Sequence, residues 1–166
     1  MRTVKARELC VEEFLPYGFY ANMINPDTEK IGAAPIEFFR DLVQQNLGNT
    51  SIASFSVCRV EPRALVVDVT EYHTTTGEGI LPLDHDVLIH VAPATPANNQ
   101  VPLEKIEVFR VPQGTMVVLR PGVWHHAPFT VNEHPANVFI VLPERAYAND
   151  CKVFELQEQD RIIIEL

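Results

Sequence analysis

Two short stretches of the chain carry side chains that could bind a metal ion or move a proton. Glu71 and His73 are two residues apart at the expected end of a strand, so both side chains should leave the same face. Glu78 follows after one turn, and His125 follows Gly122 in a second turn. Imidazoles and carboxylates suit a divalent first-row metal with open positions for substrate or water. The pattern therefore predicts a site made of Glu71, His73, Glu78 and His125, with Ni, Mn or Zn as candidate metals.

Each of these residues also has a simpler interpretation. His125 could be a half-buried barrel histidine bonded to a backbone carbonyl, and Glu71 could be a surface acid at the end of a strand. Glu78 could be a solvated turn glutamate, since most glutamates are exposed. His126 should point away from His125 and have a structural role. Because convergent titratable groups in a concave site are usually functional, we favour His125, His73 and Glu71 as catalytic residues.

Short runs of β-forming residues, separated by turn signals, make up most of the chain that must position this site. Strands are predicted at 4–7, 19–24, 52–60, 64–70, 80–83, 86–92, 105–111, 115–119, 123–126, 138–142, 151–156 and 161–166. A Pro/Ala/Asn loop is predicted at 93–102. Many short strands of this kind indicate an all-β sandwich or barrel. No repeat or domain boundary is visible, so we expect one domain over residues 1–166.

Two helices are predicted near the N-terminus. The first covers residues 11–17, with glutamates in its first turn, where the helix dipole favours anions. The second runs from Pro35 to about residue 47, because proline suits a first helical position and Gly48 suits the exit. Its apolar residues fall on one face. We expect this second helix to pack across a sheet.

The composition excludes several classes of protein. The chain has 166 residues, 46% of them hydrophobic, and a net charge of −9, which argues against a nucleic-acid or anionic-membrane surface. Cys10, Cys58 and Cys151 are widely spaced and contain no CxxC pair, so neither a disulfide framework nor a thiolate zinc site is expected. No stretch has the length of a signal peptide or a bilayer span, and we expect a cytoplasmic protein.

The spacing of the site residues resembles the cupin pattern. That pattern has a histidine, a second histidine two residues later and a glutamate shortly after, and then a glycine followed three residues later by a histidine. Here Glu71 takes the place of the first histidine, His73 and Glu78 match the next two positions, and Gly122 and His125 match the last two. The resemblance implies a cupin-type double-stranded β-helix barrel, here with short N-terminal helices.

A longer resemblance links the chain to the ureidoglycolate lyase family, a branch of the cupins. Short matches occur in the same order along most of the chain. They are the segment VEEFLPYG at 11–18, Arg59 with Pro62, Glu-Tyr-His at 71–73, Trp-His-His at 124–126 with Pro128 and Phe129, and Asn-Asp-Cys at 149–151. The run Val-Leu-Arg-Pro at 118–121 departs from the polar run that the family carries before its tryptophan.

Membership of that family would imply cleavage of ureidoglycolate to glyoxylate and urea, in purine catabolism and allantoin degradation. The substrate would be a small anionic metabolite. The reaction needs a base for the hydroxyl proton and an acid for the departing urea nitrogen. It also needs a cation for the carboxylate, and Arg59 or Arg120 could supply it. Trp124 is expected to be a core or pocket-wall aromatic.

The resemblance also implies a homodimer. Two alternatives stay open from the sequence. One is another metal-dependent cupin enzyme, an isomerase or a dioxygenase, which would require a bound metal. The other is a non-catalytic cupin that binds a small molecule.

Overall fold

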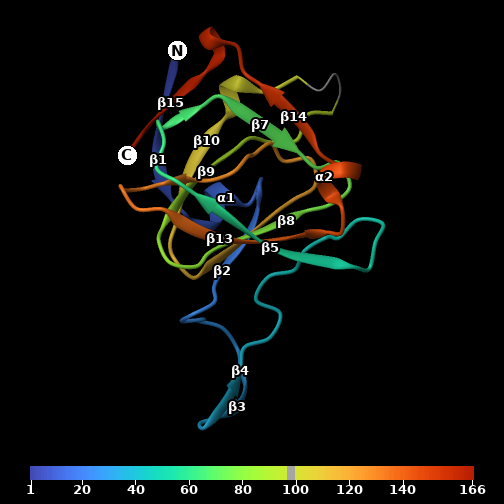
Figure 1. The fold of residues 1–166 in the computed structure, drawn as a ribbon. Coiled ribbons are helices and arrows are strands. Elements are labelled where there is room, and N and C mark those ends of the chain that lie inside the picture. Colours follow the sequence, from blue (N-terminus) through green and yellow to red (C-terminus); the bar gives the residue numbers. More distant parts are fainter. Residues whose placement is uncertain (97–99) are drawn as a thin grey trace.

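The computed structural model describes residues 1–96 and 100–166, and most of its regular elements are strands (Figure 1). The elements are β1 (Arg2–Glu8), α1 (Val11–Phe14), β2 (Gly18–Asn22), β3 (Ile31–Ala33), β4 (Ile36–Phe38), β5 (Ala53–Val60), β6 (Val66–Val67), β7 (Val69–Tyr72), β8 (Glu78–Pro82), β9 (Val87–Val91), η1 (Leu103–Lys105), β10 (Glu107–Val111), β11 (Thr115–Leu119), β12 (Phe129–Thr130), β13 (Ala136–Pro143), α2 (Ala146–Asn149), β14 (Lys152–Glu155), η2 (Glu158–Asp160) and β15 (Ile162–Glu165). The loop predicted at 93–102 includes residues 97–99, which lie outside the described residues.

Two curled sheets form the body of the molecule (Figure 1). One has six strands in the order β12-β9-β10-β1-β15-β6, and the other has five in the order β2-β11-β8-β13-β5. Most neighbours are antiparallel, but β1 runs parallel to both β10 and β15. Two smaller pairs, β14–β7 and β3–β4, complete the pairing. The all-β prediction is confirmed.

Two apolar clusters lie on opposite faces of β9. Ile89 belongs to a cluster with Ile80 and Val138 from the five-stranded sheet. Its neighbour Leu88 belongs to a second cluster that contains Trp124. This division follows from the strand itself, because successive side chains point to opposite faces. The first cluster borders the site described below.

Most strands match the sequence-based prediction, but β3, β4 and β12 were not predicted, and one predicted strand is absent. Residues 123–126 were predicted to be a strand, but they make only two isolated bridges, Glu71 with His125 and Ala92 with Trp124. The short helix at 11–17 is present as α1, which ends at Phe14. The predicted end at Gly18 is therefore too late, since Gly18 is the first residue of β2, where a Cβ would lie 2.0 Å from the Val118 carbonyl oxygen.

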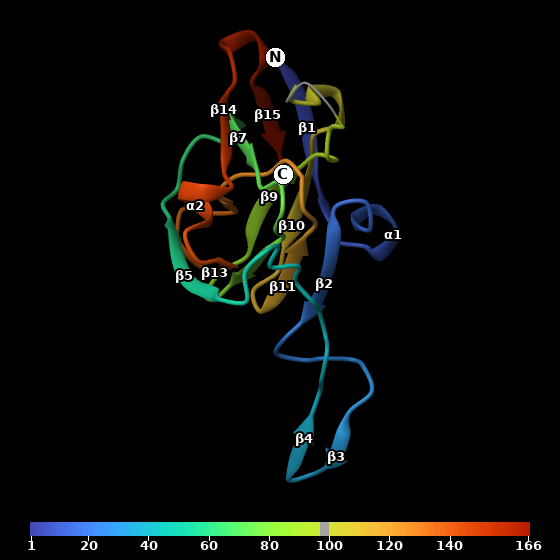
Figure 2. The same cartoon turned by 90° about the vertical axis from the view of Figure 1, so that its right-hand side faces the viewer.

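The helix predicted at 35–47 is wrong. Residues 31–38 form the β3–β4 hairpin instead, which projects away from both sheets (Figure 2). Ile36 and Phe38, on the expected buried face, are 78% and 60% exposed. Asp41 has a φ of 56°, in the left-handed region that a right-handed helix excludes. Helices of this length depend on packing of their apolar face, and here no sheet lies beside it.

Residues 39–52, between the hairpin and β5, contain no helix and run as an extended segment, which we call the strap. The Gln45 side-chain nitrogen donates hydrogen bonds to the carbonyls of Gly77 at 3.0 Å and Val141 at 2.8 Å. The Asn46 carbonyl accepts hydrogen bonds from Thr76 Oγ1 at 2.9 Å and from the Gly77 backbone N–H at 2.8 Å. The strap therefore supports the turn between β7 and β8, which carries residues of the site.

Candidate functional site

The four predicted metal ligands come from three places that the fold brings together. Glu71 lies on β7, His73 follows the end of that strand, and Glu78 is the first residue of β8. His125 is paired with Glu71 through two backbone hydrogen bonds, from Glu71 N–H to its carbonyl at 2.6 Å and from its own N–H to the Glu71 carbonyl at 2.8 Å. The bridge thus fixes His125 beside β7, although it is 54 positions from Glu71 in the sequence.

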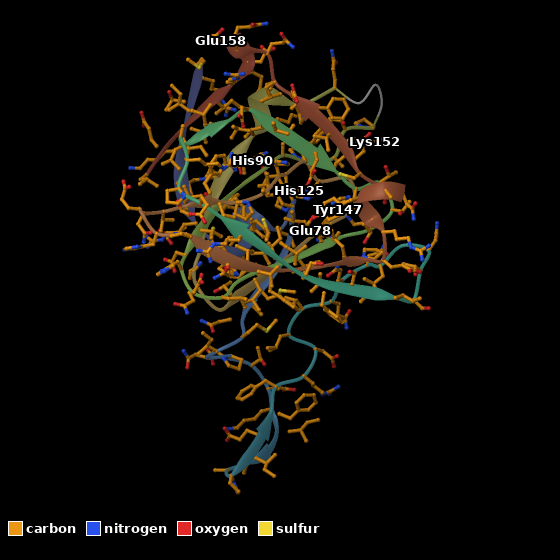
Figure 3. All side chains as sticks on the ribbon, viewed as in Figure 1. Glu78, His90, His125, Tyr147, Lys152 and Glu158 are labelled. Atoms are coloured by element: carbon orange, nitrogen blue, oxygen red, sulfur yellow. The ribbon has the colours of Figure 1, made fainter. Side chains whose placement is uncertain are left out.

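Glu78 is the centre of this group. One of its oxygens, Oε2, accepts hydrogen bonds from His73 Nε2 at 3.0 Å and from His125 Nε2 at 2.9 Å. Figure 3 shows Glu78 and His125 adjacent in the barrel. The candidate ligand atoms of Glu71, His73, Glu78 and His125 all lie within 4.8 Å of one another, and all four residues are buried.

Burial of Glu78 overturns the interpretation of a solvated turn residue. Its side chain lies on the same face of β8 as Ile80, because the two are separated by two positions. Ile80 belongs to the first apolar cluster, and Glu78 pairs with the buried Leu119 on β11. The alternation of Glu78, Ile80 and Pro82 could have revealed this from the sequence.

The second ring nitrogen of each histidine is also bonded. His73 Nδ1 donates to the Asp150 carbonyl at 2.6 Å, and His125 Nδ1 donates to the Val123 carbonyl at 2.8 Å. A carbonyl can only accept, so each Nδ1 carries a proton. The other nitrogen, Nε2, faces Glu78 in both rings. Metal-binding histidines have this arrangement, with the remote N–H donated to a carbonyl or carboxylate.

The charges of the group favour an ionised centre. Burial alone would raise the pKa of Glu78, but the charges and hydrogen bonds of His125 and His73 outweigh it and lower the pKa to about 2. Burial opposes protonation of His125, yet the neighbouring Glu78 carboxylate raises the pKa of this histidine above its usual value. Glu78 is thus an ionised buried carboxylate, and its charge is stabilised by positive charge beside it.

A divalent cation could supply this positive charge. Two imidazole nitrogens and two carboxylates form a suitable donor set, and both Nε2 atoms already face the same carboxylate oxygen. With no cation between them, each Nε2 needs a proton to bond that oxygen, and a metal ion could replace these protons. The residues present therefore fit a metal, and their types do not select one among Ni, Mn and Zn.

A small pocket opens onto this group. Its volume is about 130 Å³. It is lined by Cys58, Glu71, Glu78, His126, Ala127, Pro128, Ile140 and Tyr147. A larger hollow of about 430 Å³ lies beside α1, lined mainly by apolar residues. We place the chemistry in the smaller pocket, because it alone of these two contains the clustered carboxylates.

The structure does not bring the predicted substrate-binding residues to this pocket. Arg59 lies on the exposed face of β5, where it bonds Glu61 at 3.0 Å, while its neighbour Cys58 faces the pocket. Arg120 bonds the Leu15 carbonyl at 3.2 Å, on the surface. Strand alternation turns Arg59 outward.

Trp124 also lies outside the pocket. It is fully buried in the second apolar cluster, where its ring packs against Tyr72 and Phe154 at centroid distances of 4.6 and 5.1 Å. Its Nε1 donates to Thr95 Oγ1 at 3.3 Å. The tryptophan therefore supports the backbone beside His125 rather than lining the pocket.

The structure adds Arg63 and Tyr147, which the sequence reasoning passed over, and it brings to the pocket wall His126, for which a structural role was expected. Arg63 Nη2 donates to the carbonyls of Ala127 at 3.0 Å and Pro128 at 3.2 Å, and both carbonyls belong to pocket-lining residues. His126 lines the pocket because residues 123–126 do not alternate as a regular strand. Tyr147, on α2, also lines the pocket, and Figure 3 shows it close to Glu78. These residues have no spacing pattern that would have linked them in the sequence.

His90, whose orientation the sequence left open, faces away from the pocket into a buried region. Its Nε2 lies 3.1 Å from Thr70 Oγ1, and Thr70 Oγ1 donates to the His125 carbonyl at 3.2 Å. Among the described residues, His90 Nδ1 has no hydrogen-bond partner. Burial, followed by the nearby charges of His125 and His126, holds the pKa of His90 well below its usual value. His90 is thus a neutral residue behind the site.

Comparisons with known proteins agree with the predicted fold. A family model described as ureidoglycolate lyase matches residues 1–164. A dTDP sugar isomerase from Desulfovibrio desulfuricans G20 is similar in structure, with a TM-score of 0.54, 12% identity, and coverage of 87% of this chain and 89% of that one. At this identity the likeness shows the fold alone, and it confirms the cupin-type barrel.

An oxalate decarboxylase from Bacillus subtilis matches with a TM-score of 0.44 and 14% identity, over 63% of this chain. The chain spans about a quarter of the length of that enzyme, 24%. No curated protein matches the chain. In the described part of the chain, no helix is long and apolar enough to cross a bilayer.

Proposed function

The chain belongs to the ureidoglycolate lyase family, and we propose that it cleaves ureidoglycolate to glyoxylate and urea in the pocket beside Glu71 and Glu78. The observation that carries this proposal is the family match, which covers residues 1–164. The site geometry supports it, because a buried group of titratable side chains meets a pocket of about 130 Å³. Such a volume suits a metabolite of few atoms.

The reaction breaks a C–N bond without adding water. The hydroxyl O–H bond breaks, the carbonyl of glyoxylate forms, the C–N electrons pass to the urea nitrogen, and that nitrogen gains a proton. Because the hydroxyl and the nitrogen sit on one carbon, a single carboxylate can take the proton from the first and return it to the second. Glu71 is the residue assigned to this role, since it lines the pocket and its neighbour Glu78 is engaged by both histidines.

His73 and His125 act through Glu78 in this scheme. They hold its carboxylate at 3.0 and 2.9 Å. Glu71, His73, Glu78 and His125 would also hold a divalent ion such as Ni²⁺, Mn²⁺ or Zn²⁺, which when bound would act as a Lewis acid on a substrate oxygen. The pKa of Tyr147 is raised by partial loss of water around the phenol and by the Glu78 and Glu71 charges, so the phenol stays protonated although the residue is 63% exposed, and it can donate a hydrogen bond to the substrate.

Arg63 is the cation proposed to hold the substrate carboxylate, in place of Arg59 or Arg120. Its guanidinium donates to the carbonyls of the pocket-lining residues Ala127 and Pro128 and stacks on the Phe129 ring at 3.7 Å, and its ion pair with Asp68 is long, at 3.9 Å. His126 is less suited to the role, because burial and then the Arg63 and His125 charges lower its pKa, against the Glu71 charge. Arg63 therefore supplies the positive charge on this side of the pocket.

Replacing Arg63 by methionine should raise KM for ureidoglycolate by about 10-fold or more, since a hydrogen bond to a charged group contributes about 1.5–3 kcal/mol. Arg59→Met is the matched control, because Arg59 is exposed and outside the pocket. Steady-state kinetics of both variants measure the effect. Equal KM values in the two variants would exclude Arg63 from carboxylate binding.

The function is tested by incubating the purified chain with ureidoglycolate and measuring glyoxylate, with and without added Ni²⁺, Mn²⁺ or Zn²⁺. Glyoxylate should form well above the uncatalysed rate. If no condition exceeds that rate, ureidoglycolate is not the substrate. Metal analysis of protein purified without chelator then shows whether the Glu/His group holds an ion.

The pocket volume also separates this function from an isomerase that acts on a large substrate. Sites for drug-sized ligands measure about 300–1,000 Å³. A pocket of about 130 Å³ favours a small acid over a large substrate such as a nucleotide sugar. A non-catalytic small-molecule-binding cupin would form no glyoxylate in the assay above.

The proposed setting is purine catabolism, in allantoin degradation, in the cytoplasm. The proposed partners are a small anionic metabolite and a second copy of the chain, with no nucleic acid and no membrane. Exposed apolar residues on β5, Phe55 and Val57, and on the hairpin, Ile36 and Phe38, support a homodimer, because such patches favour protein contacts. Sedimentation as a monomer at micromolar concentration would contradict it.

A further inference from the structure

The corner between α2 and β14 reaches back to the turn that carries His73. The Asp150 carboxylate accepts three hydrogen bonds from that turn, all from Thr74 and Thr75. Thr74 N–H donates to Oδ1 at 2.7 Å, and Thr75 donates to Oδ2 from its N–H at 2.8 Å and from its hydroxyl at 2.6 Å. These bonds lower the pKa of Asp150 against the opposing effect of burial, so the residue stays ionised.

The same corner also contacts the inside of the site. The backbone carbonyl of Asp150 accepts the Nδ1 proton of His73 at 2.6 Å. The next residue, Cys151, donates from its Sγ to Glu71 Oε2 at 3.3 Å. Burial, and then the charge of Glu71 and this hydrogen bond, raise the pKa of Cys151 to about 12, so the thiol keeps its proton and acts as a donor. One short segment therefore holds both His73 and Glu71.

We propose that Asp150 is a positioning residue: its carboxylate clamps the turn at Thr74 and Thr75, so that its own carbonyl fixes the tautomer and orientation of His73. The proposal rests on the proposed function only for the reaction that the site would catalyse, since the hydrogen bonds that carry it are present without substrate. Nδ1 can keep its hydrogen bond to the Asp150 carbonyl only while the turn at Thr74 and Thr75 stays next to the corner between α2 and β14. Once they separate, Nδ1 has no fixed acceptor, the His73 ring can turn, and Nε2 is no longer held toward Glu78 or a metal ion.

The position of the clamp separates this role from simple stabilisation of the fold. Thr74 and Thr75 are exposed and Asp150 is only partly buried, whereas His73 is 1% exposed. Exposed hydrogen bonds of this kind contribute little to stability, because water can replace them. Loss of the carboxylate should therefore disturb the site far more than it disturbs folding.

Asp84 provides a matched control. Its carboxylate also accepts a backbone N–H, from Asn137 at 2.8 Å, and a side-chain N–H of the same residue at 2.5 Å. It lies in the turn between β8 and β9 and is not among the residues that line the pocket. Asp150→Ala and Asp84→Ala thus remove comparable surface hydrogen bonds, and only the first touches the site.

The test compares the full-length wild-type chain, Asp150→Ala and Asp84→Ala without added metal, by the ¹⁵N chemical shifts of the His73 ring. The wild type and Asp84→Ala should share one Nδ1 shift, that of a nitrogen whose N–H is bonded to the carbonyl, whereas the Nδ1 shift of Asp150→Ala should move, because that hydrogen bond is weakened. In a parallel titration, affinity for Mn²⁺ should fall about 10–100-fold in Asp150→Ala alone, the range for loss of a residue that supports a metal ligand.

Identical ring shifts in all three proteins would overturn the proposal. If Asp150→Ala does not fold, Asp150→Asn takes its place, because the amide keeps one acceptor oxygen but loses the carboxylate. The ring shifts require neither turnover nor bound metal, so they decide the role of Asp150 even if ureidoglycolate is not cleaved. Absence of Mn²⁺ binding in the wild type would remove only the metal part of the expectation.

Discussion

His73 and His125 bond the same oxygen of Glu78, but the chain supports the two rings in opposite ways. His125 Nδ1 bonds the carbonyl of Val123, two residues earlier in the same segment. His73 Nδ1 bonds the carbonyl of Asp150, 77 positions away. The first support can form with the local turn, and the second exists only when a long loop has closed, at a larger cost in chain entropy. One half of the site is therefore local and the other half depends on tertiary structure.

The same difference predicts which half of the site fails first. Short segments with exposed hydrogen bonds open more easily than core strands. The corner at 149–151 follows a helix of four residues, α2, and its bonds to Thr74 and Thr75 are exposed. His125, by contrast, is paired with β7 through two backbone bonds. We expect local opening to release His73 before His125.

The largest effect is expected from Glu78→Gln, which removes the group that both halves share. An amide cannot carry the charge that both Nε2 atoms face, so turnover should fall by at least about 10²-fold, the lower range for loss of one electrostatic group of an active site. The unfolding free energy should also fall, by about 1–3 kcal/mol, because a buried hydrogen-bonding group loses its partner. Kinetics and urea denaturation measure the two changes.

Glu155→Gln on β14 is the control for that experiment, since Glu155 is exposed and outside the pocket. Wild-type turnover in Glu78→Gln would show that the shared carboxylate has no part in catalysis.

A smaller effect, of a different kind, is expected from Val123→Ala. Val123 is 2% exposed in the first apolar cluster, so loss of its two methyl groups should lower the unfolding free energy by about 1–3 kcal/mol. The carbonyl that holds His125 belongs to the backbone and remains. The ¹⁵N shifts of the His125 ring should therefore match those of the wild type, and a changed tautomer would show that the local support is weaker than its geometry indicates.

The smallest effect is expected from Thr75→Val, which removes one of the three hydrogen bonds that Asp150 accepts. Stability should fall by about 0.5–1.5 kcal/mol or less, since the bond is exposed. Affinity for Mn²⁺ should fall by less than in Asp150→Ala, and Thr75→Ser, which restores a hydroxyl, should recover it. A loss as large as that of Asp150→Ala would make the hydroxyl, not the whole clamp, the decisive contact.

Sequence reasoning succeeded where the cause is local. The two-residue spacing of Glu71 and His73 puts both side chains on one face whatever the rest of the chain does. The β periodicity recovered nearly every strand for the same reason. The prediction failed for residues 35–47. Their apolar residues do recur at helical spacing, but no sheet lies beside them to bury that face, and the segment forms part of the hairpin and the strap instead.

The sequence by itself thus determined the all-β barrel, the family and the four side chains that form the Glu/His group. Only the tertiary structure decided how that group is held: Glu78 as the shared buried carboxylate, Asp150 as the support of His73, and Arg63 rather than Arg59 beside the pocket. The physical reason is the range of the contacts. Periodicity reports which face a residue occupies, whereas a hydrogen bond between residues 77 positions apart depends on every element folded between them.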